Sequence, residues 1–219
     1  MLPYHKIQTV FKRDIATKYK TLIYGDYSLP EFEYLKDNEW VYTEKVDGTN
    51  IRIMYDGETI SFGGKTDNAQ IPSFLVNQLN TIFLPQILTF RENFDGPKCA
   101  VCFYGEGYGA KIQKGGGHYR KDQSFVLFDV RVGEWWLQRT DVEEIGKQFG
   151  LDVVPIIGSG SIKNMVEMTM TGFDSAWGTF RAEGIVARPS VELKARNDER
   201  IITKIKHKDF QHERIHSKI

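Results

Sequence analysis

The residue best suited to covalent chemistry in this sequence is Lys45, in the stretch WVYTEKVDGTN at residues 40–50. It begins a short Lys-x-Asp-Gly motif that Asp47 and Gly48 complete. A lysine amine acts as a nucleophile where burial or nearby positive charge lowers its pKa. Alternating hydrophobic residues on both sides place the lysine at a strand-to-strand junction. A surface hairpin with a solvated lysine gives the same pattern, so the motif alone does not decide its role.

Four short acidic, aromatic or basic segments follow the lysine in order. They are Tyr104–Gly107 (YGEG), Phe125–Asp129 (FVLFD), Glu183–Val186 (EGIV) and Lys204–Lys206 (KIK). Each segment also has an ordinary interpretation. An acid can lie in a turn, an aromatic ring can belong to the core, and a strand-edge lysine can prevent aggregation.

In this order, the five segments resemble motifs I, III, IIIa, IV and V of the covalent nucleotidyltransferase superfamily of ligases and capping enzymes. The surrounding sequence is more similar to the RNA-ligase-2-like family, as EKVDGTN, GGKTDNAQIP, FYGEGYG and TKIKHKDF indicate. The resemblance covers residues 40–210, most of the chain. It implies an ATP-grasp-like ligase adenylation domain. The expected organisation is a single nucleotidyltransferase domain over residues 1–219, with no C-terminal OB-fold or helical domain.

The resemblance implies a reaction in three steps. AMP passes from ATP to Lys45, then to a 5′-phosphate end, and a 3′-hydroxyl then seals that end. ATP and Mg²⁺ or Mn²⁺ are the expected cofactors. Lys204, Lys206 and the metal ion would favour the neutral form of Lys45 by like-charge repulsion and would stabilise charge on the phosphate oxygens. The expected catalytic residues are Lys45, Asp47, Glu183, Lys204 and Lys206.

The resemblance also implies roles in binding the nucleotide. Glu106 is expected to hold the ribose hydroxyls, and Phe128 to stack on adenine, with Phe125 as the alternative. Glu44 is expected on the adenine side, and Glu183 on the metal, directly or through water. The full expected nucleotide-binding set is Glu44, Lys45, Asn50, Arg52, Lys65, Glu106, Phe128, Glu183, Lys204 and Lys206. Asn50 and Arg52 are expected beside the phosphates, with Asn50 also reaching the metal through water.

Two positions depart from the usual pattern of this branch. Lys65 replaces an arginine after the glycine pair, which keeps the charge but loses the bidentate contact with a phosphate. Asp47 replaces a histidine and makes motif I more similar to that of DNA ligases. The preference for RNA or DNA therefore stays open.

Composition agrees with an ordinary globular protein. The 219 residues are 41% hydrophobic and 26% charged, and the formal net charge is zero. A nucleic-acid partner therefore requires a local basic face. No apolar run approaches a membrane span. Cys99 and Cys102 are expected to be reduced, which predicts a cytoplasmic protein, and we expect a monomer.

The expected nucleic-acid contacts lie in two basic segments. Residues 111–122, KIQKGGGHYRKD, are expected to form a mobile loop because three consecutive glycines disfavour regular structure. A basic segment near the N-terminus contributes Lys12 and Arg13. The loop contributes Lys111, Lys114, Arg120 and Lys121. RNA or DNA ends, or a nicked duplex, are the expected partners. A solvated arm is the alternative interpretation of the first segment.

Hydrophobic spacing predicts an α+β fold, mostly antiparallel, with flanking helices. Helices are expected from residue 71 to about 91 with a kink at Pro85, from Thr140 to Phe149 with a capping box, and over residues 161–171. Gly105–Gly109 is expected to be a turn, and residues 153–157 a single strand. A turn is expected at Asp95-Gly96-Pro97. The basic, histidine-rich tail is expected to be a terminal amphipathic helix, with metal binding as the alternative.

Four functions remain open at this stage. An ATP-dependent RNA ligase comes first, followed by a minimal ATP-dependent DNA nick ligase. A GTP-dependent capping guanylyltransferase is disfavoured because it needs an OB-fold with a further motif. A catalytically inactive nucleotide-binding or nucleic-acid-binding domain belongs to another class, and the presence of all the motif residues argues against it.

Overall fold

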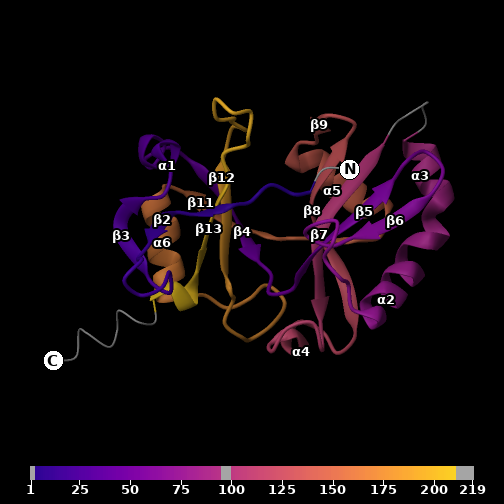
Figure 1. Ribbon diagram of the computed structural model, residues 1–219, viewed down its shortest axis with the longest axis horizontal. Coiled ribbons are helices and arrows are strands. Elements are labelled where there is room, and N and C mark those ends of the chain that lie inside the picture. The colour runs from indigo at the N-terminus through magenta and orange to yellow at the C-terminus, as the bar shows by residue number, and fades with distance from the viewer. Residues whose placement is uncertain (1–2, 95–99, 211–219) are drawn as a thin grey trace. The chain divides into compact units, whose positions relative to one another are not determined.

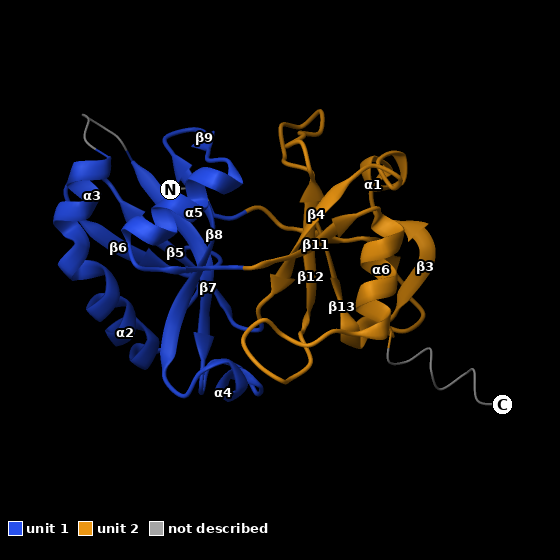
Figure 2. Ribbon diagram, turned by 180° about the vertical axis from the view of Figure 1, so that it is seen from behind, with its two compact units in different colours: residues 1–4, 47–154 blue, residues 5–46, 155–219 orange. Residues whose placement is uncertain are grey.

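The computed structural model describes residues 3–94 and 100–210, and its elements are labelled in Figure 1. The chain forms two compact units (Figure 2). Unit 1 comprises residues 1–4 and 47–154, and unit 2 comprises residues 5–46 and 155–219. The chain passes from unit 2 into unit 1 between Val46 and Asp47, inside the Lys-x-Asp-Gly motif.

Unit 1 is built on a six-stranded sheet in the order β10-β8-β7-β5-β6, with β9 also paired to β8. All its strand pairs are antiparallel except β10 with β8. The strands are β5 (Thr49–Tyr55), β6 (Ile60–Gly63), β7 (Val101–Gly109), β8 (Gln123–Val132), β9 (Trp135–Trp136) and β10 (Asp152–Val153).

Helices α2 (Ser73–Phe83), α3 (Ile87–Asn93) and α5 (Arg139–Gln148) cover one face of this sheet, and the 3-10 turn η1 (Leu84–Gln86) joins α2 to α3. The single helical turn α4 (Gly116–Tyr119) lies near the end of β7, where the Tyr119 ring contacts the Tyr108 ring. Apolar residues of α2, α3 and α5 pack with Ile51, Phe103 and Leu127 of the sheet into one core. Because strand side chains alternate, the polar residues between them occupy the opposite face. That face carries the expected nucleotide-binding residues of this unit.

Unit 2 has a five-stranded sheet in the order β1-β13-β12-β4-β11 and a separate hairpin of β2 and β3. The strands are β1 (Gln8–Thr9), β2 (Phe11–Arg13), β3 (Leu22–Tyr27), β4 (Trp40–Lys45), β11 (Ile156–Gly160), β12 (Gly184–Pro189) and β13 (Thr203–Lys206). The helices are α1 (Pro30–Tyr34), α6 (Ile162–Thr171) and the 3-10 turn η2 (His207–Phe210). Trp40, Ile185 and Ile205 pack against α6 in the core of this unit.

The predicted α+β class, with mostly antiparallel sheets and flanking helices, is confirmed. The helix pair on either side of Pro85 is confirmed, because η1 separates α2 from α3. The helix predicted over residues 161–171 is also confirmed as α6, and Ser161 caps it through a hydrogen bond from the Asn164 N–H.

Several local predictions are wrong. Gly105–Gly109 is not a turn, because β7 continues through it in register with β5 and β8. The predicted capping box at Thr140 is absent, since α5 begins one residue earlier and Gln138 occupies the N-cap without a side-chain hydrogen bond. The strand predicted over residues 153–157 is two strands, β10 and β11, which belong to different sheets.

The loop predicted over residues 111–122 is only partly irregular. Gly116–Tyr119 form the single helical turn α4, and Tyr119 is buried. The turn predicted at residues 95–97, Cys99 and the tail helix lie outside the described residues. Within the described part of the chain, no helix is both long enough and apolar enough to cross a membrane.

Gly184→Ala should destabilise the protein, because an added Cβ would lie 2.1 Å from the Ile205 carbonyl oxygen and 2.7 Å from the Lys206 Cα. Both contacts are with backbone, which cannot move aside easily. We expect a loss of about 2 kcal/mol, or roughly 4–8 °C in thermal midpoint for a chain of this size. Gly117→Ala is the matched control, because nothing lies within 4 Å of its added Cβ. Equal midpoints for the two variants, measured by circular dichroism, would contradict this interpretation.

Candidate active site

Lys45, Glu183 and Lys206 meet at one end of three neighbouring strands of unit 2. β12 lies between β4 and β13, and Gly184 pairs in register with both Lys45 and Lys206. Residues in register share a sheet face, so both lysines project from the face opposite α6. Glu183 directly precedes β12 and therefore lies beside both lysines. The sheet brings together residues that are 138 positions apart in the sequence.

The Glu183 carboxylate bridges the two lysines. Its Oε2 is 2.6 Å from the Lys45 Nζ, and its Oε1 is 2.5 Å from the Lys206 Nζ. The three side chains are 11–23% exposed. Burial raises the pKa of Glu183, but the charge of Lys45 and the hydrogen bonds from both lysines outweigh it, so the net pKa lies below the ordinary carboxyl value. Glu183 is therefore an anion that holds two cations in place.

Lys204 lies on the same face of β13 as Lys206, two residues earlier, and pairs in register with Val186. Thr203 and Ile205 alternate with the lysines and are buried on the core side. The KIK segment thus presents both lysines to the face that carries Lys45.

Glu44 faces away from Lys45, because successive strand residues project to opposite sides. It is 1% exposed and accepts hydrogen bonds from the Ser175 hydroxyl at 2.6 Å and the Ala176 N–H at 2.8 Å. Burial raises the pKa of Glu44, and these two hydrogen bonds partly offset the increase. In this arrangement Glu44 anchors the segment around Ser175. Its expected adenine contact stays a prediction.

In unit 1, β5 and β7 bring Asn50 and Glu106 side by side. The two residues are in register, on the face opposite the core. The side-chain oxygen of Asn50 is shielded from solvent and has no hydrogen-bond partner among the described residues. An unpaired buried acceptor is costly in a folded protein. Asn50 therefore offers an open acceptor beside Glu106, where the sequence predicts nucleotide and metal waters.

A β-bulge sets the orientation of Phe128. The register between β7 and β8 passes from Tyr104–Asp129 to Gly105–Leu127, so Phe128 has no opposite residue. A bulge shifts the strand's alternation by one residue and re-aims side chains. Phe125 is buried in the core, whereas Phe128 lies outside it, in edge-to-face contact with the Tyr4 ring at 5.1 Å. Of the two candidate rings, only Phe128 is thus outside the core.

Arg52 lies on the same face as Asn50 and is fully buried. Its Nε donates to the Gly64 carbonyl at 2.8 Å, and its terminal nitrogen pairs with Asp67 at 2.7 Å. The hydrogen bond and charge of Arg52 hold the pKa of Asp67 below its usual value. Arg52 thus fixes the loop that carries Lys65, whose side chain is exposed.

The glycine of Lys-x-Asp-Gly is required by close packing in unit 1. A Cβ on Gly48 would lie 2.3 Å from the Gly107 carbonyl oxygen and 2.6 Å from the Glu106 side chain. Gln113 donates to the Gly48 carbonyl at 3.0 Å, and the Asp47 N–H donates to the Tyr119 hydroxyl at 3.2 Å. Sequence reasoning missed the positioning roles of Gln113 and Tyr119, because no local pattern indicates these contacts.

The expected nucleic-acid residues of the N-terminal segment are engaged in ion pairs. Lys12 pairs with Asp26 at 2.7 Å on the surface, and Arg13 pairs with the buried Asp209 at 3.0 Å. Sequence reasoning also missed Asp209, although it lies in the TKIKHKDF segment that carries the resemblance.

Of the loop residues expected to contact nucleic acid, two form hydrogen bonds within the protein and two are exposed without an ion pair to any described residue. Arg120 makes two hydrogen bonds to Asp122, at 2.6 and 3.0 Å, and Lys121 donates to the Gly117 carbonyl at 3.2 Å. Lys111 and Lys114 are exposed, and neither forms an ion pair with any described residue. All four contacts with nucleic acid stay predictions.

The residues present fit a divalent cation that keeps most of its own waters. Over residues 3–94 and 100–210, no group of three or more His, Cys, Asp or Glu side chains could hold a metal. Mg²⁺ commonly takes one or two protein ligands and completes its shell with phosphate oxygens and water. Both Glu183 oxygens already accept from lysines, so direct ligation there would displace an ammonium group.

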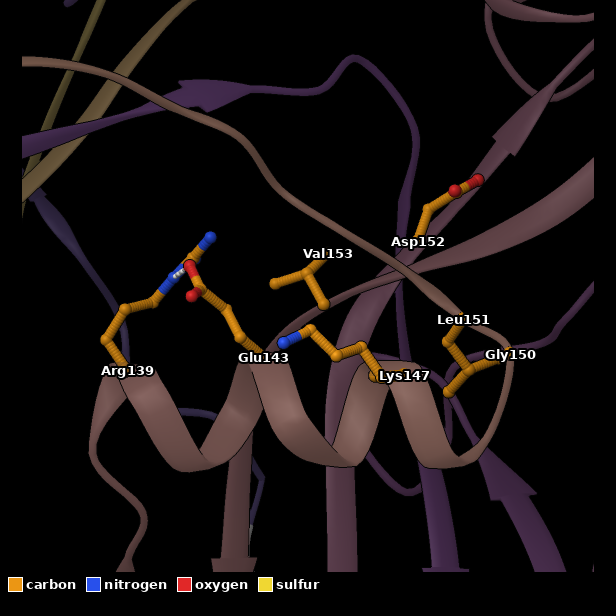
Figure 3. A pocket seen from close by; sticks show the side chains of 8 residues that line it. Arg139, Glu143, Lys147, Gly150, Leu151, Asp152 and Val153 are labelled. Atoms are coloured by element: carbon orange, nitrogen blue, oxygen red, sulfur yellow. Dashed lines mark hydrogen bonds and ion pairs between the residues drawn. The ribbon is translucent and has the colours of Figure 1, made fainter.

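A surface cavity of unit 1 lies between α5 and β10 and contains none of the expected site residues (Figure 3). Its volume is about 390 Å³. The Arg139 and Glu143 side chains point toward each other in this view and pair at 2.7 Å. Arg139 also donates to the Val154 carbonyl at 2.6 Å. The cavity's arginine is therefore already satisfied, and its role is to join α5 to the strand.

The fold is that of the nucleotidyltransferase domain of RNA ligases. A point mutant of Naegleria gruberi RNA ligase with ATP and manganese is 16% identical, with a TM-score of 0.66, over 94% of this chain and 56% of that one. A mutant of the same ligase with AMP and manganese is 17% identical, with a TM-score of 0.63, over 94% and 58%. An apo mutant is 16% identical, with a TM-score of 0.64, over 98% and 60%.

A model of the RNA ligase family matches residues 38–206, well over half of the chain. The chain belongs to the RNA ligase family. It spans 56–60% of the length of the three ligase structures. A search of curated proteins finds no match. The family resemblance read from the five motifs is confirmed.

Glu183→Gln should lower stability by about 2 kcal/mol at pH 7, because it removes the anion between two partly buried ammonium groups. A carboxylate whose pKa is depressed on folding stabilises the protein above its unfolded pKa, near 4.5, and loses that contribution as pH falls through the lower folded value. The difference between wild type and variant should therefore shrink below pH 4.5.

Urea unfolding at several pH values measures this difference. Glu167→Gln is the control. Glu167 forms an exposed ion pair with Lys163 on α6 at 3.9 Å, and such a surface pair is expected to contribute little to the free energy of unfolding. A gap between wild type and Glu183→Gln that stays constant from pH 7 to below pH 4 would refute the assigned role of the charge.

Proposed function

We propose that this protein is an ATP-dependent RNA ligase that joins 5′-phosphate and 3′-hydroxyl ends through a lysyl-AMP intermediate. The observation that carries the proposal is the bridged arrangement of Lys45, Glu183 and Lys206 at the end of three strands. Membership of the RNA ligase family supports the same reaction. ATP and Mg²⁺ or Mn²⁺ are the proposed cofactors, and RNA ends, particularly at nicks in duplexes, are the proposed substrates.

In the first step Lys45 is the nucleophile. Its ammonium group must lose a proton to solvent and leave Glu183 before its lone pair can attack the α-phosphorus of ATP. A nitrogen–phosphorus bond forms, and the bond from the α-phosphorus to the leaving pyrophosphate oxygen breaks. The second amine proton then passes to solvent. Lys204 and Lys206 on the same sheet face supply fixed positive charge for the phosphate oxygens.

When bound, Mg²⁺ or Mn²⁺ supplies further charge neutralisation at the phosphates. By the family resemblance, Glu183 would hold the metal directly or through a water, and the open oxygen of Asn50 would accept a hydrogen bond from a metal-bound water. Glu106 accepts from the ribose hydroxyls, and Phe128 stacks on adenine. Arg52 holds the loop of Lys65 near the phosphates. Glu44 contributes on the adenine side by holding the segment around Ser175.

The remaining two steps use the same residues on a nucleic-acid end. An oxygen of the 5′-phosphate attacks the lysyl-AMP phosphorus, and the nitrogen–phosphorus bond breaks, so that the amine of Lys45 takes a proton again. The 3′-hydroxyl then loses its proton and attacks the 5′-phosphorus. A phosphodiester bond forms and AMP departs. The fixed charges of Lys204 and Lys206 act on the phosphates in both steps.

A minimal DNA nick ligase is the second candidate. Asp47 favours it, because this residue makes the motif more similar to that of DNA ligases. The same catalytic residues would serve either polymer, so the first chemical step does not discriminate between the two candidates.

Lys45→Ala should abolish covalent labelling of the protein. Incubating wild type with Mg²⁺ and α-labelled ATP should give label that survives denaturation, because the phosphoramidate bond is covalent. Lys163→Ala, which changes an exposed lysine on α6, is the control and should label normally. Chelation of the metal should also prevent labelling. Label on Lys45→Ala equal to wild type, or no label on wild type from ATP, would refute the proposed mechanism.

Nicked duplexes test the choice of polymer. We expect wild type to seal a nick with RNA on the 3′-hydroxyl side at least tenfold faster than an all-DNA nick. Four duplexes with RNA or DNA on each side of the break, compared at one salt concentration, measure the preference. Faster sealing of the all-DNA nick would replace the RNA ligase proposal with the DNA ligase.

A further inference from the structure

A cavity of about 380 Å³ in unit 2 is lined almost entirely by cations. Its lining residues are Arg13, Lys20, Lys206, Lys208 and Asp209. The volume is near the lower end of the range for small-molecule sites. Among the described residues, no aromatic ring contributes to the lining, so the cavity is suited to an anion and not to a base. Lys206 also pairs with Glu183, which connects the cavity to the Lys45 site.

An ion pair between the partly exposed Arg13 and the buried Asp209 builds one wall of the cavity. The Asp209 side chain is 2% exposed, and its Oδ1 accepts from Arg13 at 3.0 Å. Its Oδ2 accepts from the Lys206 N–H at 3.1 Å. This single carboxylate therefore ties the hairpin of β2 and β3 to the end of β13. The wall is preorganised without any ligand.

A strained turn carries Lys20 into this cavity. Lys18 and Tyr19 have φ values of +55° and +62°, in the left-handed region that residues other than glycine rarely adopt. Arg13 also donates to the Tyr19 carbonyl at 3.3 Å, which helps to hold the turn. Backbone strain of this kind persists where surrounding structure enforces it, and it is concentrated at functional sites.

The cavity keeps positive charge after its internal pairs are counted. Arg13 is balanced by Asp209, and Lys206 is paired with Glu183. Lys20 and Lys208 are exposed, and neither forms an ion pair with any residue that the structure describes. Two cations remain for a ligand, and they line the same cavity.

We propose that Lys20 and Lys208 form an anion site that binds a phosphate group of a substrate next to Lys206. The identity of that substrate rests on the proposed ligase function. The phosphate belongs either to the polyphosphate tail of the nucleotide or to the 5′-phosphorylated RNA end. Arg13 and Asp209 position the site, and Lys206 joins it to the Lys45 site.

Inorganic pyrophosphate is the probe for the site itself. Isothermal titration calorimetry on the full chain should show at least tenfold weaker binding by Lys20→Ala/Lys208→Ala than by wild type. Lys163→Ala/Lys194→Ala removes the same charge from two exposed lysines of unit 2 and should bind normally. Lys20→Gln/Lys208→Gln should reproduce the loss with side chains of similar length. Equal affinity of wild type and the Lys20/Lys208 variants, or no binding by wild type, overturns the proposal.

Two further measurements identify the source of the phosphate. If the nucleotide supplies it, Lys20→Ala/Lys208→Ala should raise the KM for ATP in protein labelling at least tenfold. If the RNA end supplies it, wild-type Lys20 and Lys208 in a Lys45→Ala background should give tighter binding of 5′-phosphorylated RNA than of 5′-hydroxyl RNA. Lys20→Ala/Lys208→Ala in the same background should make the two binding affinities equal. No change in either measurement overturns the proposal. Because pyrophosphate binding requires no turnover, a failure to form lysyl-AMP refutes the ligase function without deciding this test.

Discussion

The candidate site of unit 2 depends on one carboxylate between two ammonium groups. Glu183 lies where three strands end together, and both of its oxygens hold a lysine. Without that anion, Lys45 and Lys206 would project from the same sheet face as neighbouring like charges, which is unfavourable in a partly buried site. Gly184 makes the arrangement possible, because only a residue without a Cβ allows β12 to lie this close to β13. The chemistry and the packing of the sheet therefore share one constraint.

The alternation of side chains along each strand determines which of the remaining residues face the core and which face the opposite side of the sheet. On β4, Glu44 faces the interior and Lys45 the opposite side, so one residue packs in the interior while its neighbour lies beside Glu183. In unit 1, Ile51 enters the core while Asn50 and Arg52 lie on the other face. The bulge at Phe128 is the exception that alternation alone would not produce. It shifts the register between β7 and β8 by one residue, so Phe128 and Asp129 both lie off the core side and Val130 returns to the core.

The sequence was sufficient to indicate which residues meet at the site of unit 2, and their chemical roles stay predictions. Lys45, Glu183 and the two lysines of KIK were identified by residue type and order, and the strands bring three of them into direct contact. The residues it missed act through geometry. Gln113 and Tyr119 hold the Asp47-Gly48 turn from a loop that sequence alone described as mobile. The capping box failed because α5 begins at Arg139, so the N-cap is Gln138, two residues before Thr140. Val142, Ile145 and Phe149 pack into the core of unit 1 with the helix in this position.

Whether a lysine or arginine of this chain can bind phosphate depends on whether a carboxylate of the protein already pairs with it. The net charge is zero, so the protein as a whole provides little long-range attraction for a polyanion. Several cations that looked available in the sequence, including Arg13 and Arg120, are held by carboxylates. A cation paired in this way must break its pair before it can bind phosphate, and that cost offsets much of the new contact. A pair whose acid is buried, such as Arg13 with Asp209, instead provides a fixed wall beside which exposed lysines can bind an anion. The basic surface relevant to a phosphate ligand is therefore smaller than the count of lysines and arginines suggests, and its position is fixed by buried acids.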